Sequence, residues 1–310
     1  MNRRNFIRQT AGYGLGVFAF SATGIPLPGE AANESFFKIS LAQWSLHKTH
    51  FAKKLDTLDF PAKAKNDFGI SIVEYVNQFF KDKAEDTSYL SQLLQRCKDN
   101  AVSNHLIMCD AEGDLGSPDE AARKKAVENH YKWVNAAKYL GCATIRVNAA
   151  GEGTRDEVMD AAIDGLGRLG EYAAKENINV IVENHGSYSS DGSWLATVMK
   201  QINKPNVGTL PDFGNFCITR KPGNWVDCEE SYDRYKGTSE LMPYAKGVSA
   251  KTFDFDAQGN CVETDYDRMM KIMKDSGWKG IIGIEYEGSK LEEDEGIKAT
   301  LKLLQRFQGS

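Results

Sequence analysis

The chain has 310 residues, of which 26% are charged and 41% are hydrophobic, and its formal net charge at pH 7 is −5. This acidic balance disfavours a nucleic-acid-binding protein, which would present a basic face to phosphates. No apolar run reaches the roughly 18 residues that a membrane-spanning helix needs, so we expect no stable membrane anchor.

The first 35 residues differ in character from the rest of the chain. Arg3 and Arg4 precede a mildly apolar, glycine-containing stretch, residues 11–22, and a segment rich in Pro, Gly and Ala follows. A charged region followed by an apolar one is typical of an export signal, and the arginine pair resembles the twin-arginine type. We therefore predict an export signal and linker at 1–35, a periplasmic location, and one folded domain at 36–310.

From Phe37 onward, strand-like and helix-like segments alternate. The predicted strands are 38–44, 70–76, 105–109, 143–148, 180–182, 207–210, 247–252 and 280–287. The predicted helices are about 53–68, 86–99, 118–140, 154–177, 192–202, 240–245, 264–276 and 291–307. Alternating strands and helices predict a parallel sheet. Eight such units favour a single-domain α/β fold of the (β/α)8 TIM barrel type, with an open doubly wound sheet as the alternative.

The cysteines show no C-x-x-C pair, which argues against a zinc knot or a thioredoxin-type redox pair. Export would permit disulfides. Because Cys109, Cys142 and Cys217 lie in or beside predicted strands, we expect these three to be small core residues.

The segment Gly165-Leu-Gly-Arg-Leu-Gly170 matches the G-x-G-x-x-G pattern of dinucleotide-binding proteins. That pattern binds pyrophosphate only at a strand-to-helix turn. Here it falls in the middle of a predicted helix, so we expect no nucleotide site.

Polar residues gather where the predicted strands end. These residues are Gln43, Trp44, Glu74, His105, Asn148, Glu183, Asn184, His185, Asp212, Asn215, Lys251, Glu285 and Glu287. The carboxyl ends of barrel strands converge on one mouth, where barrel enzymes place their chemistry. Glu183, Asp212 and Glu285 each follow an apolar strand, and a buried carboxylate needs a partner or a cation. Three such oxygens predict a site for Mg²⁺ or Mn²⁺, whereas Zn²⁺ would call for His or Cys ligands.

The eight units, together with Val182-Glu183-Asn184, Asp212-x-x-Asn215 and Ile284-Glu285, resemble the xylose isomerase-like TIM barrels, often grouped as sugar phosphate isomerases and epimerases. The resemblance covers about residues 37–308. It implies that Glu183, Asp212 and Glu285 hold a divalent metal (Mg, Mn or Zn). It also implies that Glu183 and Glu285 move a proton at a carbon beside a carbonyl group.

Two positions depart from the family pattern. The D-x-x-H segment of the family reads Asp212-Phe-Gly-Asn215 here, and the usual histidine on the seventh strand falls at Ser249. A hydroxyl is a weaker ligand than an imidazole, so a loosely bound or absent metal is an open alternative. Lys251 offers another source of positive charge, either among the carboxylates as a catalytic group or in a structural ion pair.

The leading hypothesis is a carbohydrate isomerase or epimerase that uses Glu183, Glu285 and Lys251. The expected sugar contacts are Trp44, Glu74, His105, Asn148, His185 and Asn215, although both histidines could equally be ordinary barrel residues. A lyase or hydratase acting on keto-sugars or keto-glycosides needs the same base and is the first alternative. A non-catalytic carbohydrate-binding barrel is the second. We expect a small carbohydrate as the partner, no nucleic acid, and leave an oligomer open.

Overall fold

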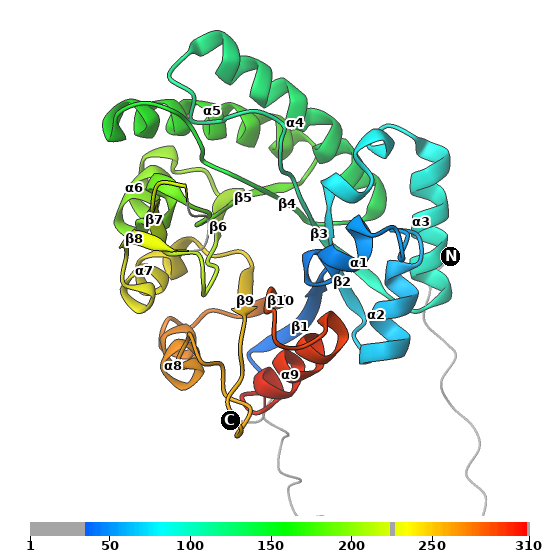
Figure 1. Cartoon of the computed structure of the whole chain (residues 1–310). Helices are drawn as coiled ribbons and strands as arrows, with labels where there is room; N and C mark the ends of the chain where they lie inside the picture. Colours follow the sequence, from blue (N-terminus) through cyan, green and yellow to red (C-terminus); the bar gives the residue numbers. More distant parts are fainter. Residues whose placement is uncertain (1–34, 224–226, 309–310) are drawn as a thin grey trace, which may run out of the picture. The chain divides into compact units, whose positions relative to one another are not determined.

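The computed structural model describes residues 35–223 and 227–308, which fold around one parallel sheet (Figure 1). Its eight strands are β1 (Phe37–Ala42), β2 (Ile72–Val76), β3 (Ser103–Met108), β4 (Thr144–Val147), β5 (Asn179–Glu183), β6 (Val207–Leu210), β9 (Val248–Thr252) and β10 (Gly280–Tyr286). They lie in the order β6-β5-β4-β3-β2-β1-β10-β9, and all the pairs are parallel.

The sheet closes where its two outer strands meet. Parallel bridges join Thr209 to Ala245 and Asp212 to Ser249. The backbone N–H of Ser249 also donates to the carbonyl of Pro211 at 2.9 Å. These contacts link β6 to β9, so the prediction of a single-domain TIM barrel is confirmed and the open sheet is excluded.

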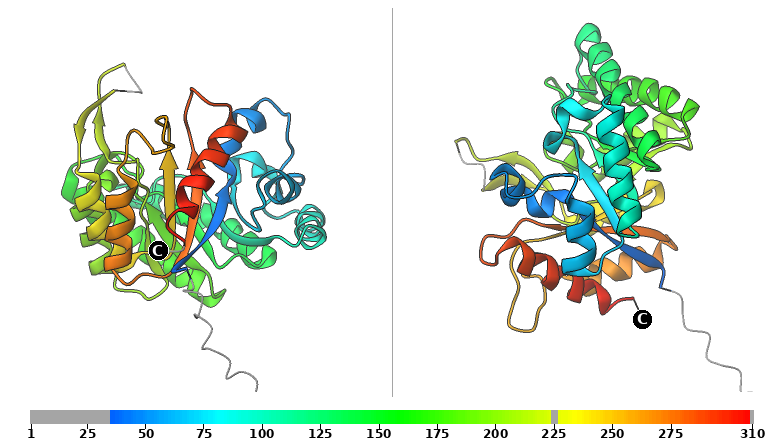
Figure 2. Two further views of the ribbon diagram at one scale, coloured as in Figure 1. Left: turned by 90° about the horizontal axis from the view of Figure 1, so that it is seen from below. Right: turned by 90° about the vertical axis from the view of Figure 1, so that its right-hand side faces the viewer.

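Helices surround the barrel, as Figures 1 and 2 show. They are α1 (His47–Phe51), α2 (Phe60–Phe68), α3 (Thr87–Asp99), α4 (Glu120–Leu140), α5 (Arg155–Lys175), α6 (Gly192–Ile202), α7 (Arg234–Leu241), α8 (Tyr266–Asp275) and α9 (Glu293–Gln305). The main apolar core lies between them and the sheet and includes Trp133, Trp194 and Phe60, all fully buried.

Capping side chains set where many of these helices begin. Asp119, Asp191, Asp233 and Asp265 accept hydrogen bonds from the first backbone N–H groups of α4, α6, α7 and α8. Thr154 forms a capping box with the third residue of α5. The helix expected over 53–68 begins later, at Phe60, with a proline in its first turn, where a missing N–H costs nothing.

A second, smaller apolar cluster fills the inside of the barrel. Its members are Ala42, Val76, Leu106, Met108, Ile181 and Leu210. Trp44 and Phe79, in the short turns η1 (Gln43–Leu46) and η2 (Asn77–Phe79), pack against it. Both turns follow a strand directly, so the two rings lie at the mouth formed by the carboxyl ends of the strands.

A hairpin of β7 (Cys217–Arg220) and β8 (Cys228–Ser231) between β6 and α7 was not expected from the sequence. A disulfide joins Cys217 to Cys228. The expectation that Cys217 is a core residue is therefore wrong, whereas Cys109 and Cys142 are buried and free, as predicted. In the left view of Figure 2, β9 points toward the end of the barrel where this hairpin and α1 lie.

The glycine-rich segment lies within α5, far from any strand-to-helix turn. A Cβ at Gly165 would come 2.1 Å from the carbonyl oxygen of Leu115. Close packing of a helix against a loop thus explains this glycine.

The predicted export signal and linker, apart from residue 35, lie outside the described residues. Among the helices that are described, none is long and apolar enough to cross a membrane.

Candidate active site

Three carboxylates meet at the mouth of the barrel. Glu183 ends β5, Asp212 follows β6, and Glu285 lies on β10, and all three are buried. One oxygen of each lies within 4.8 Å of the corresponding oxygens of the other two. We call these three residues the acid cluster. Asn184 helps to position it, because its amide both donates to the backbone carbonyl of Asp212 at 3.0 Å and accepts from its N–H at 2.7 Å.

Arg146 places a guanidinium beside the acid cluster from β4. Its Nε lies 2.8 Å from Glu183 Oε2, although neither atom makes a hydrogen bond. Its Nη1 donates to Asp110 Oδ1 at 2.6 Å, and Asn148 Nδ2 donates to the same oxygen at 2.9 Å. Burial opposes ionisation of Asp110, but the charge of Arg146 prevails and lowers its pKa to about 2.

Lys251 places a second cation among the carboxylates. Its Nζ lies 3.2 Å from Glu285 Oε1, 3.3 Å from Glu287 Oε1 and 3.8 Å from Asp212 Oδ2. It also donates to Asn215 Oδ1 at 3.2 Å. Burial opposes the charge, yet these carboxylates raise the pKa of Lys251 well above its usual value. The side chain therefore points inward and stays charged, which settles the orientation that the sequence left open.

Ser249 bridges two members of the acid cluster. Its Oγ lies 2.6 Å from Asp212 Oδ2 and 2.9 Å from Glu285 Oε2. A hydroxyl has one proton and can donate to only one of them, so the other contact requires a carboxyl proton. Burial raises the pKa of Asp212 to about 8. Burial also raises the pKa of Glu285, but the charge of Lys251 outweighs burial, and the pKa of Glu285 is lowered. Asp212 is thus the group suited to carry the shared proton.

The carboxyl group of Glu183 lies between the amide of Asn215 and the guanidinium of Arg146. Its Oε1 accepts a hydrogen bond from Asn215 Nδ2 at 2.9 Å. Burial raises its pKa to about 7, against the opposing charge of Arg146. A carboxyl group near neutrality can both accept and release a proton, which is what a general acid or base requires.

The acid cluster could bind a divalent metal ion. Its ligands are all carboxylate oxygens, which suit Mg²⁺ or Mn²⁺. The position where the family pattern implies a histidine carries the hydroxyl of Ser249, so Zn²⁺ is less well matched. A bound ion would share the cluster with Lys251 and Arg146, whose charges already contact its oxygens.

Two expected sugar contacts lie within their strands, because β2 and β3 continue beyond them. Glu74 is in the middle of β2, where it accepts a hydrogen bond from Ser40 Oγ at 2.5 Å, and burial raises its pKa to about 8. His105 lies at a register shift in β3, with its Nε2 against Gly247, just before β9 begins. Burial lowers the pKa of His105 to about 4. Neither residue stands at a strand end, and the expectation that they contact a sugar stays a prediction.

The remaining candidates do lie at the mouth. Trp44 Nε1 donates to Glu287 Oε1 at 2.5 Å, and Asn215 joins Glu183 to Lys251. Asn148 has a buried Oδ1 that accepts no hydrogen bond from the described residues, and His185 is exposed. These four could meet a ligand above the acid cluster.

Sequence reasoning missed Arg146, Asp110 and the bridging role of Ser249. A charged residue inside an otherwise apolar strand, Thr144-Ile-Arg146-Val147, was an available signal, since such a side chain must find an anion inside the barrel. Asp110 gave no comparable signal, because an acid in a loop is ordinary.

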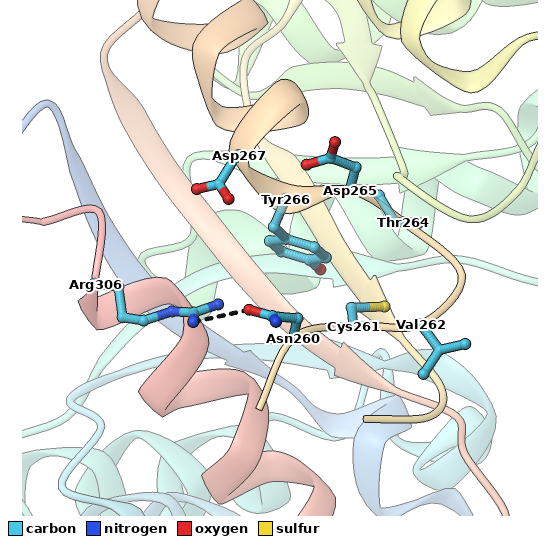
Figure 3. A pocket seen from close by; sticks show the side chains of 8 residues that line it. All are labelled: Asn260, Cys261, Val262, Thr264, Asp265, Tyr266, Asp267 and Arg306. Atoms are coloured by element: carbon cyan, nitrogen blue, oxygen red, sulfur yellow. Dashed lines mark hydrogen bonds between the residues drawn. The ribbon is translucent and has the colours of Figure 1, made fainter. Parts of the chain in front are cut away.

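The structure also has a pocket of about 290 Å³ away from this mouth (Figure 3). It is lined by Asn260, Cys261, Val262, Thr264, Asp265, Tyr266, Asp267 and Arg306. Arg306 donates to Asn260 Oδ1 at 2.9 Å and ties the loop before α8 to the end of α9. None of these residues belongs to the acid cluster.

A closed eight-stranded barrel with three carboxylates at its mouth defines a TIM barrel with an enzyme-like site. The sequence pattern of the xylose isomerase-like TIM barrel family matches residues 62–307, and the chain belongs to that family. No curated protein matches the sequence.

Solved structures share the fold at low sequence identity. A xylose isomerase-like TIM barrel protein from Mycobacterium smegmatis in complex with magnesium has a TM-score of 0.63 and 14% identity, covering 88% of this chain and 97% of that one. A D-psicose 3-epimerase determined with D-fructose has a TM-score of 0.63 and 13% identity, covering 88% and 100%. A probable 3-DHS dehydratase from Bacillus anthracis has a TM-score of 0.62 and 16% identity, covering 87% and 99%.

Proposed function

We propose that this protein is a carbohydrate isomerase or epimerase that moves a proton at a carbon beside a carbonyl group. The observation that carries the proposal is the convergence of Glu183 and Glu285, from separate strands, to within 4.8 Å together with Asp212. Two carboxylates so placed can act on a single carbon or on two neighbouring carbons of one substrate.

Glu183 is the group that removes the proton. Burial raises its pKa to about 7, so the carboxylate can accept a proton from carbon and release it again near neutral pH. The electrons of the broken C–H bond form an enediolate, whose negative oxygen needs a nearby donor or cation. Returning the proton to the opposite face of the same carbon gives an epimer, and returning it to the neighbouring carbon gives an isomer. Glu285 is the second proton carrier.

Lys251 supplies the fixed positive charge for the enediolate oxygen. Its ammonium lies 3.2 Å from Glu285, so charge stabilisation and proton return take place side by side. A divalent metal held by Glu183, Asp212 and Glu285 would polarise the same carbonyl group when bound. Arg146 holds Glu183 in position through their 2.8 Å ion pair.

The substrate class is a free sugar or a glycoside. The two cations described at the mouth, Arg146 and Lys251, are already paired with carboxylates, so neither is free to clamp a phosphate. We also propose that the protein is exported to the periplasm, on the basis of the twin-arginine-like pattern. The disulfide between Cys217 and Cys228 supports an oxidising compartment.

A lyase or dehydratase reaction is the second candidate. The same enediolate can expel an oxygen substituent from the next carbon, and the departing oxygen then needs a proton. Lys251, a charged donor among carboxylates, is placed to supply it.

Proton exchange in deuterium oxide tests the proposal. Keto-sugars and keto-glycosides incubated with the protein are expected to gain deuterium beside the carbonyl, as followed by NMR. Glu183→Gln and Glu285→Gln are each expected to reduce this rate by about 10²–10⁴-fold. Glu171→Gln, which changes an exposed carboxylate paired with Lys204, is the control and should leave the rate unchanged.

Exchange that survives both substitutions would refute the assignment. Exchange accompanied by loss of water or of an aglycone would identify the lyase instead. Sugar binding without any exchange would identify a non-catalytic barrel.

A further inference from the structure

An exposed aromatic surface lies at the mouth beside the acid cluster. Phe51, the last residue of α1, is 58% exposed and is one of three large hydrophobic residues so exposed among those described. Its ring meets Trp44 edge to face at 5.9 Å and 89°, and Phe79 at 5.3 Å and 69°. We call Trp44, Phe51 and Phe79 the aromatic platform. Exposing an aromatic ring to water costs free energy, and a ligand that covers the ring recovers it.

The rings that support the platform are held in a fixed arrangement. His47 stacks on Trp44 at a centroid distance of 5.1 Å, and His50 stacks on Phe79 at 4.5 Å. Burial lowers the pKa of His50 to about 4, so its ring is neutral at physiological pH. Gln43 donates to Thr57 at 3.0 Å and lies 3.2 Å from the ring of His50.

The start of α1 is also anchored. Glu293, a buried residue at the start of α9, accepts hydrogen bonds from the backbone N–H groups of Lys48 and Thr49 at 2.7 and 3.0 Å. It also accepts from the hydroxyl of Thr49 at 2.6 Å. A surface that is ordered before binding loses little conformational entropy when a ligand covers it.

The platform is continuous with the acid cluster. Trp44 Nε1 donates to Glu287, and the same oxygen of Glu287 lies 3.3 Å from Lys251 Nζ. The whole ring of Trp44 therefore separates Phe51 from Glu287. A second ring joined to a sugar ring bound beside Lys251 would extend across Trp44 toward Phe51.

We propose that the aromatic platform is a subsite for the second ring of a glycoside, which makes a disaccharide-like sugar the substrate class of this enzyme. This inference rests on the proposed function for the position of the reacting ring. The apolar face of a pyranose stacks on Phe51, while its hydroxyl groups stay in water. The reacting ring then lies over the acid cluster.

Binding measurements by isothermal titration calorimetry test the subsite separately from the chemistry. The probes are glucose and galactose and their disaccharides cellobiose, maltose, trehalose and lactose, titrated into the full chain. At least one disaccharide is expected to bind about three- to tenfold more tightly than its monosaccharide, the range expected for one aromatic stacking contact. Phe51→Ala and Phe51→Leu should both remove this preference, whereas Phe51→Trp should retain it.

Tyr139→Ala is the matched control, because it removes another exposed aromatic ring, at the far end of α4. It should leave the preference intact. Equal affinity for mono- and disaccharides in the unchanged protein, or a preference that survives Phe51→Ala, would overturn the subsite. So would dissociation of an oligomer by Phe51→Ala in light scattering, because the ring would then cover a second copy. A disaccharide preference without proton exchange would keep the subsite and refute the proposed reaction.

Discussion

The two sides of the barrel mouth differ in chemistry. On the side of β5, β6, β9 and β10, buried carboxylates surround Lys251, and each charge contacts an opposite charge. On the side of β1 and β2, the strands end in apolar residues, Ala42 and Val76, and the turns after them carry the rings of Trp44 and Phe79.

The charged side suits the chemical reaction, and the aromatic side suits recognition of the substrate. Buried, paired charges are costly to maintain and are found where a protein must move protons or stabilise charge. Aromatic rings supply area and shape with little ordering cost. Glu287 joins the two sides, because one of its oxygens contacts both Trp44 and Lys251. Three substitutions probe this division, beginning with the largest expected effect.

Lys251→Met tests the charged side. It removes the one ammonium among Glu285, Glu287 and Asp212 in the described mouth, so we expect the free energy of unfolding to fall by about 3–5 kcal/mol. A divalent cation should then replace part of the lost charge, so millimolar Mg²⁺ should stabilise this variant more than the unchanged protein.

Urea unfolding with and without Mg²⁺ provides the measurement. Lys204→Met, which breaks a partly exposed pair with Glu171, is the control and should cost about 1 kcal/mol or less. A Lys251→Met variant that is fully stable, or that Mg²⁺ does not stabilise further, would show that the ammonium does not balance the acid cluster.

Glu74→Gln tests a buried carboxyl group on β2, inside the barrel. Folded Glu74 keeps its proton up to a pKa of about 8, while in the unfolded chain a glutamate releases it near 4.5. Its contribution to stability is therefore complete below pH 4.5 and is lost as the pH rises toward 8. Relative to the unchanged protein, Glu74→Gln should be more stable at pH 8 than at pH 5 by about 1–3 kcal/mol.

Chemical unfolding at the two pH values checks this. Glu171→Gln on the surface of α5 should show no such dependence. A difference of the opposite sign would mean that Glu74 is ionised in the folded protein.

Trp44→Phe tests the link between the two sides and should have the smallest effect. It keeps an aromatic ring but removes the N–H that donates to Glu287. We expect a rise in KM of about three- to tenfold with little change in kcat, because loss of one hydrogen bond costs about 0.5–1.5 kcal/mol and Lys251 still holds Glu287. Steady-state kinetics provide the measurement, and a kcat loss as large as that of Glu183→Gln would place Trp44 in the reaction itself.

Much of the fold could be predicted because regular alternation of strands and helices is a local property. The runs Val180-Ile-Val182 and Ile281-Ile282 identify buried strands, and their order along the chain implies the barrel. The hairpin of β7 and β8 escaped prediction because its strands are short and exposed, and only the pairing of Cys217 with Cys228 reveals it.

The acid cluster was also predictable, since Glu183, Asp212 and Glu285 each follow an apolar strand. The sequence placed Glu74 and His105 at strand ends, whereas both lie inside strands, because a difference of one or two residues in strand length is not visible in a local pattern. Asp110 could not be found, because only its contacts with Arg146 and Asn148 distinguish it from any loop acid.

The amino-acid sequence was sufficient to predict the barrel and its three carboxylates. Both predictions rest on local patterns, namely the alternation of strands and helices and an acid that follows an apolar strand. Only the folded chain determined which side chains pair with one another at the mouth. Arg146 with Glu183, Lys251 with Glu285 and Trp44 with Glu287 are separated by 37, 34 and 243 positions, distances over which no local pattern acts. Pairing of neighbouring strands, β4 with β5, β9 with β10 and β1 with β10, brings these partners together. Closure of β6 against β9 adds Asp212, which it places beside Ser249 and Lys251.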